Sequence, residues 1–324
     1  NEFYSNIKTL FTIHNIQYQG KYGLDLLNDV LGIPEQYLSV MEYDKCVNMV
    51  KGAIECSDWV STVSPTYAQE ILTPWFSHGL HNILLERKWK LSGILNGIDT
   101  ASFDPMTDPN IYEHFSADDL SGKAVNKQKL QERLGLAQDP NVPLIGMVTR
   151  MVSHKGLDLV KETLDKLMWQ SNAQFVILGS GDWEYECFFR EMQEKYPGRL
   201  CACFGFVPEL SRKIYAGADL FLMPSKSEPC GLSQMMALRY GTIPIVRETG
   251  GLKDSIQDSG DGNGNGFTFK SYNSGDMLYA ISRALEGYAQ PEGWEILTKR
   301  AMHCDNSWGR SAKEYIRLYK QICG

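Results

Sequence analysis

The sequence lacks the spacings that would turn its cysteines into a metal site or a disulfide framework. Eight cysteines are scattered over 324 residues, none forms a C-x-x-C pair, and no cysteine and histidine cluster has zinc-binding spacing. We therefore expect reduced thiols and a cytoplasmic protein.

Long apolar runs and an excess of positive charge are missing as well. No apolar stretch approaches the ~20 residues of a membrane-spanning helix, and no secretory signal is evident. The net charge of -7 argues against nucleic acid as the main partner, because phosphate backbones attract basic surfaces. With 43% apolar and 22% charged residues, the composition is that of an ordinary globular protein. We expect neither a membrane nor a nucleic-acid partner.

Several catalytic fingerprints are also absent. The first strand is not followed by G-x-G-x-x-G, which argues against a nicotinamide enzyme, and there is no Walker sequence, no G-x-S-x-G elbow and no metal-ligand spacing. The chain also begins at Asn1, without Met, directly before "IKTLFTIHN". From that start we expect the N-terminal part of a longer protein to be missing.

What the sequence does contain, from about residue 142 on, is a regular alternation of apolar runs and helical patterns. The runs are "VPLIGMVTR", "AQFVILGSG", "LCACFGF", "DLFLMPS" and "TIPIVRE", and segments such as "GLDLVKETLDKLMWQ" between them have helical spacing. Short apolar strands joined by helices are typical of βαβ units. The prediction is an α/β domain with a doubly wound parallel sheet.

The earlier residues are less regular. "IKTLFTIHN", "DWVSTVSP" and "LSGILNG" are predicted strands, and "PTYAQEIL" a helix with Pro65 in its first turn. They indicate the C-terminal portion of a second α/β domain. We expect residues 104–123 to be an exposed connection into a helix around Asn126–Leu134, and 258–266 to be a flexible surface loop. The predicted domains are residues 1–138 and 139–305, followed by a helix at 306–324 that packs back on the first domain.

Polar residues gather where the predicted strands end, and ligands bind at the carboxyl ends of parallel strands. Arg150 ends a strand and Lys155 precedes a helix, so the two cations could hold a diphosphate; the alternative is that both are solvated surface residues. His14 at another strand end could donate to a substrate oxygen or be purely structural.

The stretch "SKSEPCGLSQ" places Glu228 where a strand passes into a helix predicted to start near Gly231. The N–H groups of that helix start favour an anion, and Gly231 allows a ligand close to the backbone. A carboxylate there suits sugar hydroxyls. The alternative is that Glu228 only stabilises the helix start.

Six stretches resemble the bacterial glycogen synthases and plant starch synthases in order and spacing. They are "TIHNIQYQG", "STVSPTYAQEI", "LSGILNGID", "VTRMVSHKGLDLV", "PSKSEPCGLSQ" and "YGTIPIVRETGGLKDSI". The resemblance covers nearly the whole chain. It implies a GT-B fold of two Rossmann-like domains, the first one incomplete here. It also implies transfer of glucose from ADP-glucose to the non-reducing end of an α-1,4-glucan, with retention of anomeric configuration.

The resemblance also implies roles for individual residues. Arg150 and Lys155 would neutralise the diphosphate leaving group, and Glu228 would hold the donor sugar's hydroxyls. No metal or cofactor is implied, because cations and a helix dipole take its place. The other substrate contacts implied are His14 and Asn96 to glucose, Phe206 beside adenine, and Cys230, Gly231, Leu232 and Ser233 at the helix start.

The sequence departs from the family pattern at three points. The N-terminal "K-x-G-G-L" stretch is absent from these residues, from which we expect a weakly active or inactive chain. Ser233 stands where bacterial members commonly have Thr. Met236 stands where the related E-x7-E glycosyltransferases have a second Glu, which favours the synthases. Two alternatives stay open: a related GT-B enzyme that uses a UDP-sugar, and a non-catalytic nucleotide- or glucan-binding module.

Overall fold

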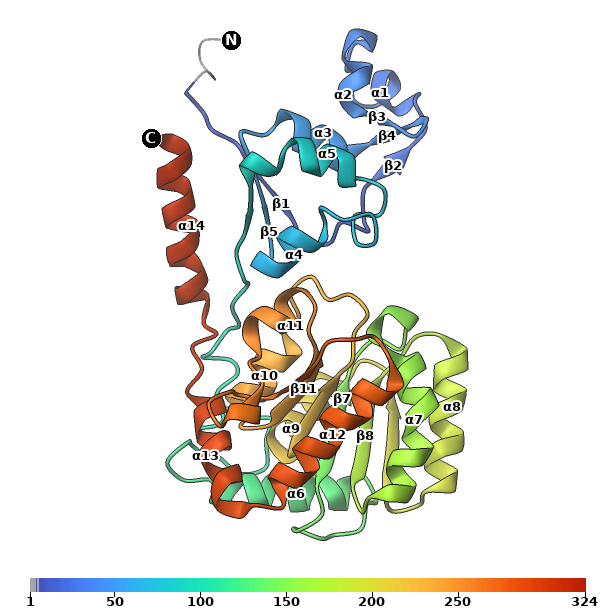
Figure 1. Ribbon diagram of the computed structural model, residues 1–324, viewed down its shortest axis with the longest axis vertical. Helices are drawn as coiled ribbons and strands as arrows, with labels where there is room; N and C mark the ends of the chain where they lie inside the picture. Colours follow the sequence, from blue (N-terminus) through green and yellow to red (C-terminus); the bar gives the residue numbers. More distant parts are fainter. Residues whose placement is uncertain (1–3, 5) are drawn as a thin grey trace. The chain divides into compact units, whose positions relative to one another are not determined.

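The computed structural model describes Tyr4 and residues 6–324, which form two compact units (Figure 1). The first unit comprises the described residues up to Asn96 together with Gly309–Gly324, and the second comprises Gly97–Trp308. None of the described helices is both long and apolar enough to cross a membrane.

The second unit is built on a parallel sheet with the strand order β12-β11-β10-β7-β8-β9. The order reverses beside β7, the first of these strands in the chain, and such a reversal opens a crevice at the carboxyl ends of the strands. The strands are β7 (Leu144–Val148), β8 (Gln174–Gly179), β9 (Leu200–Phe204), β10 (Leu220–Met223), β11 (Ile243–Arg247) and β12 (Phe267–Phe269).

Helices cover both faces of this sheet, so its central strands are buried on both sides (Figure 1). In β8, Phe175 and Ile177 join the core shared with α7, α8 and α12, whereas Val176 and Leu178 join the core shared with α6 and α9. That two-sided burial explains the continuous apolar runs of the sequence. The helices are α6 (Ser121–Arg133), α7 (Leu157–Gln170), α8 (Trp183–Lys195), α9 (Pro208–Gly217), α10 (Ser233–Arg239), α11 (Gly250–Ser255), α12 (Ser274–Tyr288) and α13 (Pro291–Met302), with 3-10 turns η4 (Ser153–Lys155) and η5 (Ser259–Asp261).

The first unit contains a smaller parallel sheet with the order β1-β5-β6, made of β1 (Leu10–Ile13), β5 (Trp59–Thr62) and β6 (Leu91–Gly93). Helix α4 (Pro65–Glu70) follows β5, and its start is fixed because the Ser64 hydroxyl accepts a hydrogen bond from the Tyr67 N–H at 2.9 Å. An antiparallel sheet accompanies it, formed by β2 (Lys21–Tyr22), β4 (Cys46–Asn48) and β3 (Glu42–Tyr43).

Short helices complete the first unit, and the long C-terminal helix α14 (Trp308–Cys323) runs almost entirely within its residues. The Ser311 hydroxyl of α14 donates to the Leu95 carbonyl at 2.6 Å, which ties this helix to the chain just after β6. The short elements are α1 (Leu26–Asp29), η2 (Glu35–Tyr37), α2 (Leu38–Met41), α3 (Met49–Cys56), α5 (His81–Glu86) and η3 (Lys88–Lys90).

Three features differ from the expectations set by the sequence. Strand β12 was not predicted, because it is only three residues long and follows a glycine-rich loop. The compact units divide at Asn96, earlier than the predicted boundary at 138, because α6 packs against α9 in a shared core. The expectation that 104–123 is exposed was wrong: Ile111 and Phe115 are buried in that core.

Candidate active site

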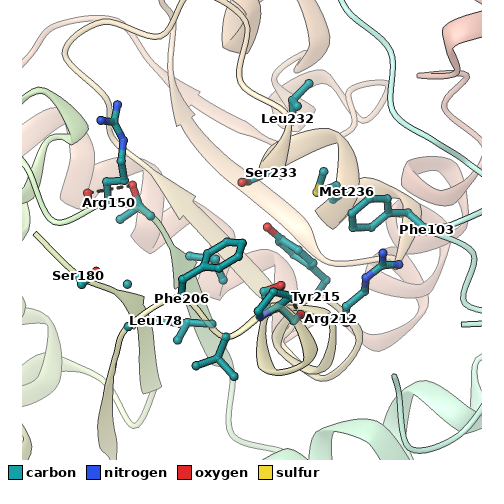
Figure 2. Close-up of a pocket in the computed structure, with 17 residues that line it drawn as sticks. Phe103, Arg150, Leu178, Ser180, Phe206, Arg212, Tyr215, Leu232, Ser233 and Met236 are labelled. Carbon is teal, nitrogen blue, oxygen red and sulfur yellow. Dashed lines mark hydrogen bonds between the residues drawn. The ribbon is translucent and has the colours of Figure 1, made fainter. Parts of the chain in front are cut away.

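A cavity of about 540 Å³ opens at the carboxyl ends of β7, β8 and β9, beside the point where the strand order reverses. Its walls come from the three strand ends, from α9 and the start of α10, and from Phe103. Figure 2 shows Phe206, Tyr215, Ser233 and Phe103 around one space. The lining includes Phe103, Arg150, Phe206, Arg212, Tyr215, Leu232, Ser233 and Met236.

Arg150 lies two residues after the end of β7 and is exposed to solvent at the edge of this cavity. Its Nη2 lies 3.5 Å from Nε2 of His154. Burial, together with the cationic Lys155 and Arg150, lowers the pKa of His154, so the imidazole is neutral at pH 7 and can accept from the guanidinium. The Arg150 guanidinium thus supplies a positive charge at the edge of the cavity, and the neutral His154 beside it does not repel it.

Glu228 and Lys155 form a buried ion pair next to this region. The Lys155 Nζ donates to Glu228 Oε2 at 2.6 Å, the Ser225 hydroxyl donates to the same oxygen at 3.0 Å, and the two charged side chains are only 16% and 9% exposed. Within the described structure, neither residue belongs to the cavity lining.

The backbone around Glu228 is held by the first turn of α11. The Gly251 N–H donates to the Glu228 carbonyl at 3.2 Å, and Gly250, with φ of 44°, packs so closely that a Cβ there would lie 2.0 Å from the same carbonyl oxygen. Only glycine fits such a contact. The "TGGL" stretch therefore supports the position of the carboxylate.

The helix behind Glu228 begins later than predicted. Helix α10 starts at Ser233, with Leu232 as its N-cap, because Gly231 has φ of 70° and lies outside helical geometry. The Gln234 side chain donates to the Cys230 and Gly231 carbonyls at 3.2 and 2.9 Å and so fixes this turn. Cys230 is buried and lies outside the cavity lining of the described residues, as does Gly231, whereas Leu232 and Ser233 line the cavity.

The far wall of the cavity was not predicted. The Arg212 guanidinium stacks on the Phe103 ring, with 3.7 Å between the guanidinium carbon and the ring centroid, and it pairs with buried Asp108 at 3.1 Å. Burial raises the pKa of Tyr215 to about 12, so its phenol stays protonated beside Ser233. Asp108 and Arg212 are far apart in sequence, and no local pattern signals their contact.

Phe206 presents an aromatic face on the other side, because it is 92% exposed in the turn after β9. The structure thus brings Arg150, Phe206, Leu232 and Ser233 to one cavity. His14, which is exposed after β1, and Asn96 belong to the other compact unit, and their part in the site stays a prediction.

Comparison with known proteins identifies the family. Residues 1–86 match the family model described as starch synthase catalytic domain, and residues 127–300 match that of glycosyl transferases group 1. A glycogen synthase of Geobacillus thermodenitrificans (strain NG80-2) is 49% identical over 324 residues, which is 99% of this chain and 67% of that protein. The chain belongs to the glycogen and starch synthase family. A glycogen synthase of Bacillus subtilis (strain 168) is 45% identical with the same coverage.

Among solved structures, the catalytic domain of starch synthase IV from Arabidopsis thaliana, bound to ADP and acarbose, matches with a TM-score of 0.91 and 39% identity. The match covers 98% of this chain and 67% of that one. This member of the glycogen and starch synthase family is therefore a glycosyltransferase of the GT-B fold class, which confirms the fold predicted from the sequence.

Proposed function

We propose that this chain transfers glucose from ADP-glucose to the non-reducing end of an α-1,4-glucan, with retention of configuration. One observation carries the proposal: Arg150, the exposed ring of Phe206 and the start of α10 at Ser233 line one cavity at the strand ends. The buried carboxylate of Glu228 lies in the loop that leads into α10. The match to an ADP-bound starch synthase supports the choice of nucleotide.

Two parts of the cavity wall would stabilise the leaving diphosphate. Cleavage of the bond between glucose and the diphosphate leaves negative charge on the departing phosphate. Arg150 would neutralise that charge at the cavity mouth, and the first N–H groups of α10, near Ser233, would add donors to the phosphate oxygens. Groups fixed before the reaction need no reorganisation as the charge develops, which lowers the barrier.

The contact between Lys155 and Glu228 competes with the role at the diphosphate that the resemblance implies for Lys155. The ammonium is bonded to the carboxylate, so in the absence of substrate its charge is already balanced. We assign Glu228 to the donor sugar's hydroxyls, with Lys155 and Ser225 fixing the orientation of the carboxylate. Lys155 can turn to the diphosphate only by giving up this 2.6 Å contact.

The aromatic side of the cavity suits the nucleoside. Phe206 offers an open ring face, and the Phe103–Arg212 stack forms the opposite wall. A planar base between two such walls would bury apolar surface on both sides. His14 and Asn96 would contact the glucose from the first unit.

The test is donor competition in the protein that carries this sequence. We expect ADP-glucose to extend maltooligosaccharides with α-1,4-linked glucose, detected as lengthened chains that β-amylase digests. Faster turnover of UDP-glucose would reject the assigned donor. Binding of ADP with no elongation would instead identify a non-catalytic nucleotide-binding module.

A further inference from the structure

The imidazole of His154 lies beside the cation that would bind the diphosphate. Its Nε2 is 3.5 Å from Nη2 of Arg150, and Arg150 lines the nucleotide cavity. An anion that draws the Arg150 guanidinium toward itself therefore also changes the surroundings of this imidazole. The steps of glucosyl transfer described above use Arg150 but leave its histidine neighbour without a part.

The position of His154 is fixed by its backbone. The residue lies in the middle of the 3-10 turn η4, and its carbonyl accepts a hydrogen bond from the Lys226 N–H at 2.9 Å. Gly156, which ends the turn with φ of 78°, packs so closely that a Cβ there would collide with the Pro224 carbonyl oxygen. The turn is thus held against the segment that follows β10, and the imidazole stays next to Arg150.

Charged side chains from four segments face the imidazole of His154. Two cations favour its neutral form, and two carboxylates favour its protonated form. They are Arg150 after β7, Lys155 in η4, Glu228 before α10 and Asp182 at the N-cap of α8. Burial and the two cations together outweigh the carboxylates and lower the pKa of His154 below the ordinary 6.5, so the imidazole is neutral at pH 7. The ammonium of Lys226 lies 5.6 Å from the centroid of the Tyr272 ring.

A diphosphate bound at Arg150 reverses this balance of charges. It adds negative charge next to the imidazole and offsets the cations that keep the imidazole neutral, and a nearby negative charge stabilises the imidazolium form. Once protonated, Nε2 is a donor and can no longer accept a hydrogen bond, so it releases the Arg150 guanidinium to the phosphate oxygens. The imidazolium also adds a second positive charge beside the phosphate that would leave.

We infer that His154 takes up a proton when the diphosphate of the nucleotide binds, and that this proton releases Arg150 to the phosphate. The inference rests on the proposed function, which assigns a nucleotide diphosphate to Arg150. His154 is a positioning residue, because it acts on the phosphate through Arg150. The proton comes from the solvent and returns to it when ADP leaves. Proton uptake on binding means that the affinity for ADP rises as the pH falls.

The experiment is calorimetry of ADP binding to the parent chain and to His154→Gln, at about pH 6.5 in PIPES and in Bis-Tris, two buffers with different ionisation enthalpies. Glutamine keeps an acceptor and a donor but cannot take up the proton. His303→Gln is the matched control, because His303 is an exposed histidine of the same unit, outside the cavity lining. The terminal phosphate of ADP also titrates, at about pH 6, but it does so equally with all three proteins.

We expect the parent and His303→Gln to take up more protons per ADP bound than His154→Gln does. Between about pH 8 and pH 6, the ADP Kd should fall at least about threefold further in the parent than in His154→Gln. A second measurement needs no variant: in the NMR titration of the parent, the midpoint of the His154 imidazole should move to higher pH when ADP is added.

Equal proton uptake by the parent and His154→Gln, with ADP bound by both, overturns the inference and leaves the proposed function standing. An ADP affinity that His154→Gln lowers by the same factor at every pH shows a purely structural role and also overturns it, as does an imidazole midpoint that ADP does not move. A parent chain that does not bind ADP overturns the proposed function, and the inference with it.

Discussion

The Lys155–Glu228 pair allows the sharpest test of how the site is held together. Both side chains are less than one-fifth exposed, so the removal of one partner leaves the other as a charge in a poorly hydrated place. Loss of one member of a buried ion pair costs about 3–5 kcal/mol. Because Lys155 retains 16% exposure and water can relieve part of that cost, we expect Glu228→Gln to lower the free energy of unfolding of the second unit by about 3 kcal/mol.

The double variant Lys155→Met with Glu228→Gln removes both charges at once. We expect it to be more stable than either single variant would suggest, with a coupling of about 1–3 kcal/mol in the double-mutant cycle. The assay is urea unfolding, with the second unit followed through the amide exchange of β7 and β10. Single variants within about 0.5 kcal/mol of the parent, a range typical of surface substitutions, would refute the buried-pair reasoning.

Two further predictions concern single residues of the second unit. Gly250→Ala should reduce glucosyl transfer strongly, because its Cβ would lie 2.0 Å from the Glu228 carbonyl oxygen. Gly262→Ala is the control, since Gly262 also has a positive φ but no neighbour within 4 Å of an added Cβ. Equal activities of the two variants would contradict the contact. The second concerns acid stability. Burial alone would raise the pKa of Asp258, but hydrogen bonds from Arg283, Thr268 and Gly260 outweigh it and hold the value at about 2, below the ordinary 3.8. Asp258 therefore contributes stability that is present above about pH 4 and is lost as the pH falls through about 2. Asp258→Asn should flatten this part of the unfolding free energy against pH, and an unchanged profile would argue against the Arg283 pair.

Much of the second unit could be predicted because its strands are buried on both faces. Short continuous apolar runs such as "VPLIGMVTR" are typical of strands that are buried on both faces of a parallel sheet. The polar residues that follow them mark the carboxyl ends of the strands, where ligands bind. Arg150 was found by that reasoning, whereas Phe206 and Ser233 were implied by the family resemblance, and all three line the cavity.

What could not be predicted depends on contacts between distant residues. Arg212 stacks on Phe103 and bonds to Asp108, which also accepts from the Tyr240 hydroxyl. This network buries a segment whose prolines and charges indicated an exposed connection. The start of α10 at Ser233 instead of Gly231 depends on a backbone angle that the glycine permits but does not require.

The central claim is that the cavity at the ends of β7, β8 and β9 binds the nucleotide diphosphate through Arg150. Calorimetry of ADP binding tests it, with Arg150→Ala compared with Arg190→Ala, an exposed arginine on α8 outside the cavity. A charge-assisted hydrogen bond is worth about 1.5–3 kcal/mol, so the ADP Kd should rise about 10- to 150-fold in Arg150→Ala and remain unchanged in Arg190→Ala. Equal ADP affinity in the parent and Arg150→Ala would contradict the claim.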